Sequence, residues 1–549
     1  MTARPLSLLL LLVFVVFAVV GCDVVFQDFF THHHAGSSTG TSTSTSTSGA
    51  GICTPGAMVA CYEGPAGTEG VGSCKSGSMT CAADGGSFGP CEGAITPLPE
   101  SCGTSVNDDD CDGKLPQQCG GDLIWALRGG DQQDQRALSV AVDDAGNVLV
   151  TGFFKGILDF PGGTLTSAGG VDVFLVKIDA AGNYVWGKAF GDQGDQFGAS
   201  VAVDGAGNVL ATGRFGGTID LGSGALVSSG GADVFLARFG PDGALMWSKR
   251  FGGSGDQWGT SVKADSAGNV VLTGFLSGVG SVDFGGGVIA SPNGSNSFAA
   301  KFDPLGSHLW SNGFGEQSGS LAYDLAVDGA GNVIVTGQFT GTLDLDSGPL
   351  TSAGASDIFV AQFDPLGAGT WGKVFGDNAA QLGLGVATNT AGDVFITGEF
   401  QGSIDVGADK LTSFDGYDMF LLKLDSMGAA QWGKRFGLSG DQIGASVAVD
   451  SAGDVLLTGQ LFGTAEFGGN ALTSYGASDV LLVKLNSAGS HLWSKHFGDV
   501  ADLQVGHGIA SDSAKNILVA GFFEGAVDFG GGPLVSAGGS DAFVAKFSP

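Results

Sequence analysis

The clearest shortage in this sequence is positive charge. Lys and Arg total 23 against 55 Asp and Glu, which gives a net charge of −32 and a pI near 4.2. Nucleic-acid binding needs basic stripes that neutralise phosphate, and the chain has none. Adsorption to anionic lipid headgroups is disfavoured for the same reason. We therefore exclude nucleic acid as a partner and expect divalent cations, neutral glycans or basic molecules to suit this surface.

Several other features are missing. After the first 20 residues no apolar run is long enough for a membrane span of about 20 residues. No stretch from residue 120 onward has long 3.6-residue periodicity, so helices should be scarce. The same region lacks cysteine and a G-x-S-x-G nucleophile elbow. Its histidines (His308, His491, His496 and His507) are scattered without a recognisable partner, so catalysis is poorly supported.

What the chain has instead is a repeat. Tryptophans recur at steps of 61 residues with one step of 63, at Trp125, Trp186, Trp247, Trp310, Trp371, Trp432 and Trp493. The motif G-N-V-x-x-T-G and an Asp followed by an apolar run recur with the same period. A fixed period of this kind indicates one supersecondary unit copied many times.

Each unit predicts four strands. DVFLVKID and NYVWGKAFG flank the turn at Asp179, and ASVAVD and NVLATGRF flank the turn at Asp204. Both turns read D-x-x-G, in which Asp bonds the backbone and Gly supplies a positive φ. The Gly/Ser-rich remainder, GTIDLGSGALVSSGG, predicts a further extended arm or long loop. Seven units of four strands without helices are typical of a β-propeller.

The two ends of the repeat array favour a closed ring. The array opens with a lone Trp strand at Asp122–Gly130 and closes with a lone D-x-F strand at Asp541–Phe547. Pairing these two halves would complete the seventh blade and hide the sheet edges. The fold class that we predict is therefore all-β: a seven-bladed β-propeller over 120–549, closed by pairing of the first and last strands and preceded by a small disulfide-rich module.

The pattern D-x-x-G-N-V-x-x-T-G-x-F, with a following D-F such as Asp159-Phe160, resembles the SBBP family of bacterial β-propeller repeats. The resemblance covers roughly Gly120–Pro549 and rests on seven copies. It implies a propeller fold and an exported setting, without a defined reaction.

The N-terminus predicts export. Residues 1–22 combine Arg4, an apolar run over 6–20 and the sequence Val19-Val20-Gly21-Cys22, which resembles a bacterial lipobox with a Val where Leu is usual. The resemblance implies that Cys22 carries lipid; the alternative is an ordinary signal peptide with an incidental Cys. Residues 23–52 then form a flexible Ser/Thr/Gly tether. Three adjacent histidines beside it, His32–His34, make a poor preformed metal site.

Residues 53–119 predict a separate module. Once Cys22 is assigned to lipid, the remaining cysteines are even in number: Cys53, Cys61, Cys74, Cys81, Cys91, Cys102, Cys111 and Cys119. In an exported chain this number indicates about four disulfides in a domain too small for a large core. The pairing is left open. The C-x₂-C knuckles of the zinc alternative are absent.

An acidic motif lies inside this module. Asp108, Asp110 and Asp112, followed by Gly113, form D-x-D-x-D-G, a spacing that can wrap oxygen ligands around Ca²⁺. The bidentate Glu of an EF-hand is missing, because Cys119 stands in its place. The motif, with Cys102 before it, also resembles a Cys-rich metal-binding motif of myxobacterial-type secreted proteins. Two interpretations stay open: a calcium site, or a solvated acidic loop held by a disulfide.

Within the repeats, recurring residues are first expected to serve the fold. The Trp series should pack between blades, and the recurring Lys177 and its equivalents should make a local ion pair or bond a neighbouring blade. One recurring loop reads G-D-Q, and its carboxylates (Asp134, Asp195, Asp256 and Asp441) are predicted at one mouth of the channel. They either hold the loop backbone or form a ring that binds a cation or a sugar. Any asymmetric site is expected in the third copy, which has the unmatched Trp258.

Together these features predict a lipoprotein of the bacterial cell envelope, anchored to the outer membrane or cell surface by its lipid alone. Its monomeric propeller would act as a binding or scaffolding head for a protein or glycan partner, with Ca²⁺ as the one candidate cofactor. The alternative is an exported hydrolase or lyase acting on glycans or peptides. A channel lined by Ala, Ser and Val favours the first function. A converging acid, base and cation would favour the second.

Overall fold

The structure is a computed structural model. It describes residues 53–62, 69–71, 74–84, 87–95 and 120–549, without 293, 316–318, 346, 408 and 501. The chain divides into two compact units, Met1–Pro116 and Gln117–Pro549. All regular elements in the described residues are strands. No helix in that part of the chain is long and apolar enough to cross a membrane.

The first unit contains one described hairpin, β1 (Met58–Cys61) with β2 (Gly77–Thr80). Disulfides join Cys53 to Cys81 and Cys61 to Cys91. Cys74 is also disulfide-bonded. The prediction that disulfides hold this region is confirmed for these five cysteines.

The second unit contains seven four-stranded antiparallel sheets among its described residues. We number them in chain order and give each from its inner to its outer strand: sheet 1, β4 (Gln135–Val142), β5 (Val148–Phe154), β8 (Asp172–Ile178), β9 (Tyr184–Phe190); sheet 2, β10 (Gln196–Val203), β11 (Val209–Phe215), β14 (Asp233–Phe239), β15 (Leu245–Phe251); sheet 3, β16 (Asp256–Ala264), β17 (Val270–Ser277), β20 (Asn296–Phe302), β21 (His308–Phe314); sheet 4, β22 (Leu321–Val327), β23 (Val333–Phe339), β26 (Asp357–Phe363), β27 (Gly369–Phe375); sheet 5, β28 (Gln381–Thr388), β29 (Val394–Phe400), β32 (Asp418–Leu424), β33 (Ala430–Arg435); sheet 6, β35 (Gln442–Val449), β36 (Val455–Leu461), β39 (Asp479–Leu485), β40 (His491–Phe497); sheet 7, β41 (Gln504–Ser511), β42 (Ile517–Phe523), β45 (Asp541–Phe547), β3 (Leu123–Gly129).

The D-x-x-G turns form as the sequence indicates. The Asp179 carboxylate accepts the N–H groups of Ala181 and Asn183 at 2.9 and 2.8 Å. Gly182 has a φ of +92°, a left-handed conformation that only glycine adopts at little cost. The turn at Asp204 repeats this pattern with Gly207 at +79°. Both hairpins of a sheet are therefore fixed by local chemistry.

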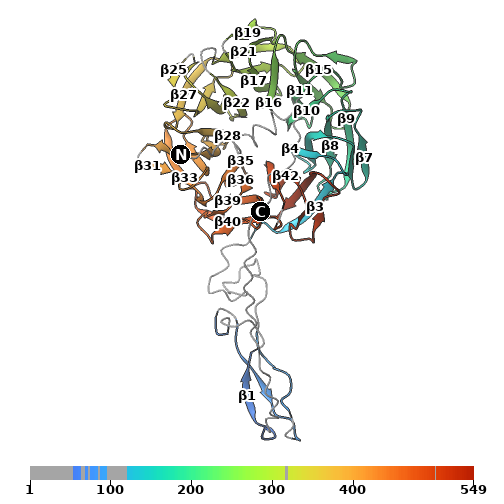
Figure 1. Cartoon of the computed structure of the whole chain (residues 1–549), viewed down its shortest axis with the longest axis vertical. Helices are drawn as coiled ribbons and strands as arrows, with labels where there is room; N and C mark the ends of the chain where they lie inside the picture. Colours follow the sequence, from blue (N-terminus) through green and yellow to red (C-terminus); the bar gives the residue numbers. More distant parts are fainter. Residues whose placement is uncertain are drawn as a thin grey trace, which may run out of the picture. The chain divides into compact units, whose positions relative to one another are not determined.

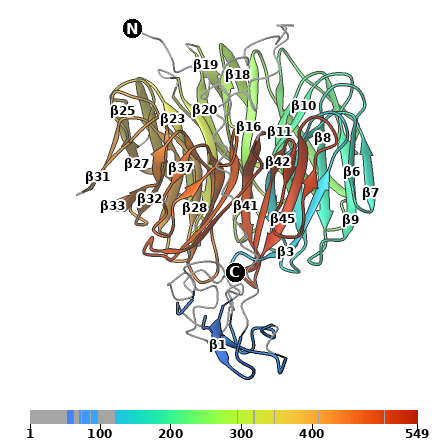
Figure 2. The ribbon, with the colours of Figure 1, turned by 60° about the horizontal axis from the view of Figure 1, so that its bottom comes forward.

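The Gly/Ser-rich arms are short hairpins that leave each sheet between its second and third strands. They are β6 (Ile157–Phe160) with β7 (Gly163–Thr166), β12 (Thr218–Asp220) with β13 (Ala225–Val227), β18 (Gly280–Asp283) with β19 (Val288–Ser291), β24 (Thr342–Leu345) with β25 (Gly348–Thr351), β30 (Ser403–Val406) with β31 (Asp409–Thr412), β37 (Thr464–Ala465) with β38 (Leu472–Thr473), and β43 (Ala526–Val527) with β44 (Leu534–Val535). Figures 1 and 2 show labelled arm strands such as β7 and β31 on the outside of the unit.

The seven sheets follow one another around a centre, with their inner strands toward it (Figure 1). Each inner strand contacts the next along the chain, and β4 also contacts β41 of sheet 7. Sheet 7 contains strands from both ends of the unit, because β3 pairs antiparallel with β45, Leu123 opposite Phe547. This is a β-propeller-like arrangement.

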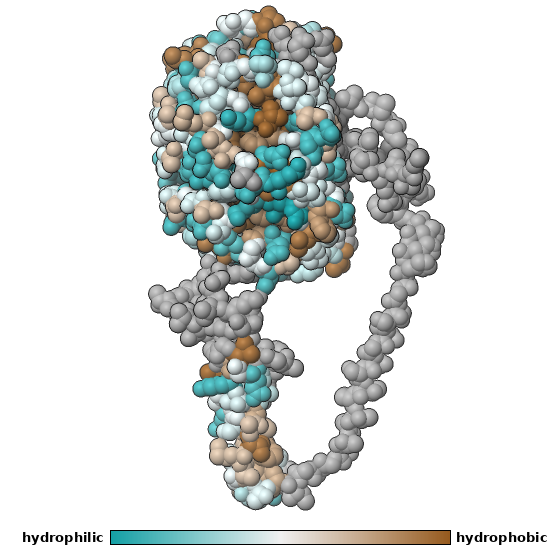
Figure 3. All heavy atoms as spheres, turned by 90° about the vertical axis from the view of Figure 1, so that its left-hand side faces the viewer, coloured by the Kyte–Doolittle hydropathy of each residue, from teal (hydrophilic) through white to brown (hydrophobic). Residues whose placement is uncertain are grey.

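The hydrophobic core lies between neighbouring sheets. One cluster joins Leu210 and Leu236 of sheet 2 to Val262 and Phe298 of sheet 3. Another joins Leu518 and Val544 of sheet 7 to Val150 and Phe174 of sheet 1, so the same packing links the last sheet to the first. The second and third strands bury both faces, which explains their continuous apolar runs. The outer wall seen in Figure 3 is a mixture of hydrophilic and hydrophobic groups.

Candidate functional site: the channel and its mouth

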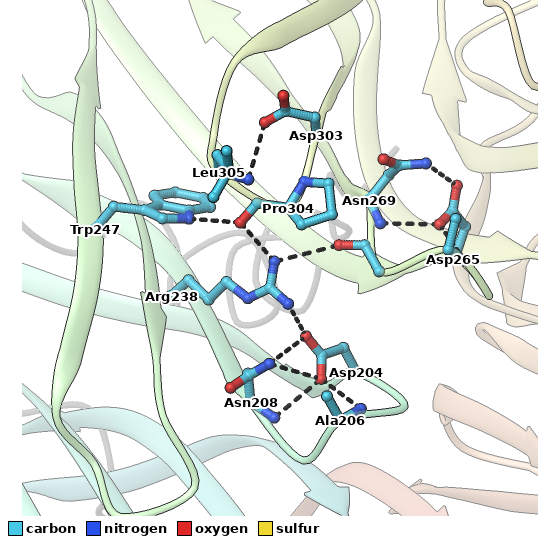
Figure 4. Close-up of polar contacts among 12 residues, drawn as sticks. Asp204, Ala206, Asn208, Arg238, Trp247, Asp265, Asn269, Asp303, Pro304 and Leu305 are labelled. Atoms are coloured by element: carbon cyan, nitrogen blue, oxygen red, sulfur yellow. Dashed lines mark hydrogen bonds and ion pairs between the residues drawn. The ribbon is translucent and has the colours of Figure 1, made fainter.

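The cation that recurs in six of the seven sheets is part of the framework; sheet 4 has Gln362 at this position. Arg238 of sheet 2 pairs with Asp204 of its own sheet and donates to the carbonyl oxygen of Pro304, in the outer turn of sheet 3, at 2.7 Å (Figure 4). Lys177 does the same one sheet earlier, 2.9 Å from Asp143 and 3.2 Å from the Pro241 carbonyl. Both parts of the structural interpretation, an ion pair and a bond to the neighbouring sheet, are therefore present.

The recurring tryptophan serves the same contact. The Nε1–H of Trp247 donates to the Pro304 carbonyl at 3.1 Å, so one oxygen accepts from both Trp247 and Arg238 (Figure 4). Trp125 of sheet 7 reaches the Ala180 carbonyl of sheet 1 at 3.2 Å. Among the described residues this bond is not found for Trp432 or Trp493; next to Trp493, the last and first strands of the unit, β45 and β3, pair without this turn. The buried Nε1–H of Trp493 has no acceptor among the described residues.

The four predicted carboxylates lie just before, or at the first residue of, the inner strands, and each holds backbone. Asp195, Asp256 and Asp441 accept the N–H groups of Val171, Ala232 and Tyr417 at 3.1, 2.8 and 2.8 Å. Asp134 accepts both the N–H and the hydroxyl of Ser540 at 3.1 Å. The following glutamines, such as Gln196, are fully buried and donate to loop carbonyls. These bonds supply a framework role, while a ligand role for the four carboxylates stays a prediction.

The inner strands enclose a channel. A cavity of about 350 Å³ is lined mainly by Val and Ala from all seven inner strands, for example Val140, Ala141 and Val142 of β4. Each inner strand has a bulge, and the skipped residue (Ala199 in β10) lines the channel. The bulge also lets Ser200 Oγ accept the Val262 N–H of the next inner strand at 3.2 Å. The predicted Ala, Ser and Val lining is thus observed.

One residue interrupts this lining with charge. Lys263 of β16 stands where six other inner strands carry alanine (Ala141, Ala202, Ala326, Ala387, Ala448 and Ala510), and it lines the channel. No ion pair or hydrogen bond of its ammonium is found among the described residues. An unpaired ammonium at this depth attracts anions into the channel.

A smaller cavity of about 150 Å³ lies deeper, next to Lys263, and also touches Tyr323, Asp324 and His507. Both carboxylate oxygens of Asp324 accept hydrogen bonds, one from the Ser261 hydroxyl at 2.8 Å and one from the Val386 N–H at 3.0 Å. Burial, with a smaller contribution from Arg136, lowers the pKa of His507 to about 3. The imidazole is therefore neutral near pH 7 and is a poor general acid there.

The second strands of two sheets carry a charged residue at position x of the T-G-x-F motif. Arg214 of β11 lies over the ring of Trp258 at 3.5 Å and that of Phe197 at 4.5 Å. Burial lowers the pKa of Arg214 to about 10. Trp258, expected to mark an asymmetric site, thus packs against a buried guanidinium.

Glu399 of β29 occupies the same position in sheet 5 and is 1% exposed. Burial, and secondarily the charge of Asp441, raises the pKa of Glu399 to about 8. No hydrogen bond or ion pair of its carboxyl is found in the described part of the chain. Repeat-based reasoning missed Glu399 and Lys263; the available signal was each one's departure from its aligned copies.

Several predicted site residues lie outside the described residues: Cys22, His32–His34, Cys102, Asp108, Asp110, Cys111, Asp112 and Cys119. Within the described residues, no group of three or more His, Cys, Asp or Glu side chains could hold a metal ion. Lipidation and calcium binding therefore stay predictions.

Comparisons with known proteins support the fold type only. No family model matches the chain, so the resemblances to SBBP repeats and to the myxobacterial-type module stay predictions. An uncharacterized WD repeat-containing protein, L264 of Acanthamoeba polyphaga mimivirus, is 24% identical over 478 residues, which cover 74% of this chain and 31% of the viral protein. The chain thus spans about a third of that relative's length.

Solved structures give weak likenesses. The WD40 β-propeller domain of Doa1 is 13% identical with a TM-score of 0.40, covering 78% of this chain and 97% of the domain. The polysaccharide lyase Uly1 is 9% identical with a TM-score of 0.40, covering 78% of this chain and 99% of the lyase. At these values neither likeness indicates an activity.

Proposed function

We propose that this protein is an exported lipoprotein of the bacterial cell envelope whose seven sheets are the blades of one closed β-propeller. The propeller acts as a monomeric binding or scaffolding head for a protein or glycan partner. Cys22 carries the lipid, residues 23–52 are the tether, and the cysteine-rich module, with Ca²⁺ at Asp108, Asp110 and Asp112, separates head from membrane. The pairing of β3 with β45 and the contact between β4 and β41 support closure.

The observation that carries the binding function is the channel lining. The larger cavity is lined mainly by Val and Ala, and Lys263 is its one charged residue, so no acid and base converge there. Lys263, Asp324 and His507 do share the smaller cavity, and this favours the alternative of a hydrolase or lyase. Its volume of about 150 Å³ is below the range of roughly 300–1,000 Å³ that ligand pockets need, and both Asp324 oxygens accept hydrogen bonds. Binding is therefore the better-supported function.

The anchoring part is tested with the full chain in an exporting bacterial host. Wild type and Cys22→Ser are grown with an alkyne-tagged fatty acid and fractionated. Label on wild type that is absent from Cys22→Ser supports the lipoprotein. Equal labelling of both, or none on either, would overturn it.

The head is tested by capture and reconstitution. Wild-type protein captures envelope proteins and glycans, and each captured molecule is then purified and bound again. Reversible binding that leaves the mass of the partner unchanged supports a binding head. A partner that is cleaved or eliminated on incubation supports the enzyme alternative.

A further inference from the structure

Three exposed aromatic side chains lie on two neighbouring sheets. Of the described residues from 120 onward, only Phe414, Phe462 and Tyr475 are aromatic and exposed, at 71%, 44% and 62%. We call them the aromatic patch. Phe414 belongs to sheet 5, and the other two belong to sheet 6.

The fold does not need aromatic groups at these positions. The N–H of Phe414 and that of Tyr475 donate to the buried Asp418 and Asp479. The same bond is made elsewhere by residues with small side chains, namely Ala168, Ser229, Ala353 and Ala537. The position of Phe462, whose N–H donates to the carbonyl before the buried Gln, is held in other sheets by Lys155, Gly216, Gln401 and Glu524. Large exposed apolar groups where the repeat uses small or polar residues indicate a role in contact with another molecule.

Backbone contacts bring the three residues to one place. Phe462 precedes Gly463, and Tyr475 follows Ser474. The Ser474 N–H donates to the Gly463 carbonyl at 2.8 Å, which brings the two aromatic residues together. Asp441, in the loop between the two sheets, accepts the Tyr417 N–H on its carboxylate and the Phe462 N–H on its carbonyl. Asp441 therefore connects the loop that carries Phe414 to the loop that carries Phe462.

The support beneath the patch is specific to this junction. The connector β34 (Gly437–Ser439) pairs with β37 of the next arm, which gives the one three-stranded arm sheet in the described residues. A β-carbon on Gly440 would approach Phe462 Cδ1 to 3.0 Å, so this ring lies directly on the connector. The ring of Tyr475 packs at a tilt of 34° against that of His496, with 4.9 Å between the ring centroids, and His496 Nδ1 lies 2.6 Å from Asp479. These contacts limit the motion of the rings before a ligand binds.

The charge around the patch is negative. Asp415 is exposed next to Phe414, and Asp441 lies between the sheets. The nearby Arg435 is neutralised by Asp418 at 2.9 Å. Aromatic faces together with carboxylates attract organic cations, through the ring quadrupole and through Coulomb attraction.

We propose that the aromatic patch, with Asp415 and Asp441, binds a Lys- or Arg-bearing segment of the protein partner. This deepens the proposed function and rests on it, because it assigns the partner's chemical class and the docking face. The cationic side chains lie over the aromatic faces, and the carboxylates pair with their charges.

The test uses the purified full chain with its disulfides intact. The probe is a fluorescein-labelled GGKGRGKGG peptide followed by anisotropy, with GGQGQGQGG and cellohexaose as neutral probes. The test variant is Phe414→Ala, Phe462→Gly and Tyr475→Ser, which installs residues found in other copies. The matched control is Leu305→Ala with Leu366→Ala, which removes two exposed apolar side chains of the turns in sheets 3 and 4.

We expect saturable binding of the basic peptide by wild type and the control, and at least about a tenfold weaker binding by the test variant. Asp415→Asn should weaken binding about threefold, with less effect as salt rises from about 50 to 300 mM. Equal peptide binding by wild type and the test variant would refute the proposal. So would binding of cellohexaose but not of the peptide, which would make the patch a saccharide-stacking surface.

The captured partner separates this proposal from the proposed function. If the test variant captures and rebinds the partner as wild type does, the patch assignment is wrong and the binding head stands. If neither protein captures a partner or binds the peptide, both proposals are overturned.

Discussion

Replacement of the buried Glu399 by glutamine should stabilise the protein at neutral pH. Neighbouring sheets already carry Gln338 and Gln460 at this position of the second strand, so the amide fits the framework. The carboxyl of Glu399 is buried, and no hydrogen bond to it is found among the described residues. The variant keeps the size of the side chain and removes only the group that can ionise.

The magnitude follows from the raised pKa. Burial raises the pKa of Glu399 from 4.5 to about 8, so the folded protein keeps a proton that the unfolded chain releases above about pH 4.5. Stability is therefore highest below pH 4.5 and is lost as the pH rises towards 8. One pH unit in this window costs about 1.4 kcal/mol, so the wild type has lost about 3 kcal/mol at pH 7. Glu399→Gln does not suffer this loss.

The assay is urea unfolding of wild type and Glu399→Gln at several pH values from 4.5 to 8, followed by tryptophan fluorescence. The stability difference should be near zero at pH 4.5 and reach about 3 kcal/mol in favour of the variant at pH 7. Other titrating groups contribute equally to both proteins and cancel. Asp409→Asn, which removes an exposed carboxylate of the same sheet, is the control and should show no such trend. A difference that does not change with pH would refute the raised pKa of Glu399.

Three further predictions follow from the framework. Arg238→Met leaves the buried Asp204 unpaired and should destabilise the protein by roughly 3 kcal/mol or more in urea unfolding, whereas an effect below about 1 kcal/mol would contradict a structural ion pair. Because the pKa of His507 is lowered to about 3, stability should fall as the pH drops below about 6.5; His507→Ala should remove about 2 kcal/mol of that loss at pH 5, and identical pH profiles in thermal melts would argue against it. The Cys53–Cys81 disulfide closes a loop across a sequence separation of 28 residues, so its replacement by two Ala residues should lower the stability of the first unit by about 3–4 kcal/mol. The expected result is faster proteolysis of the first unit and unchanged cleavage beyond residue 120.

The repeat explains why so much of the fold could be predicted. The turns at Asp179 and Asp204 depend on residues four positions apart, so their chemistry is visible in the sequence. The framework role of Lys177 was predictable because a cation recurs at this position in six of the seven sheets. The pairing of β3 with β45 could be predicted because the repeat array begins with one strand of the outer hairpin and ends with the other.

The site was harder to predict, because it depends on departures from the repeat. Which residues line the channel is decided by a bulge in each inner strand, and alternation of polar and apolar residues does not locate it. Lys263 therefore reads as a surface lysine until β16 is placed at the channel. Likewise, Phe414 and Phe462 are 48 residues apart, and only Asp441 reveals that they are neighbours.

The pairing of β3 with β45 has a consequence for the order of folding. Leu123 of β3 pairs with Phe547 of β45, so β3 has no partner strand until Phe547 has been synthesised. At about 5–20 residues per second, synthesis of the intervening segment takes on the order of half a minute or more. During that time β3 is an unpaired edge strand that other chains could capture. Deletion of β45 would leave β3 without its partner strand.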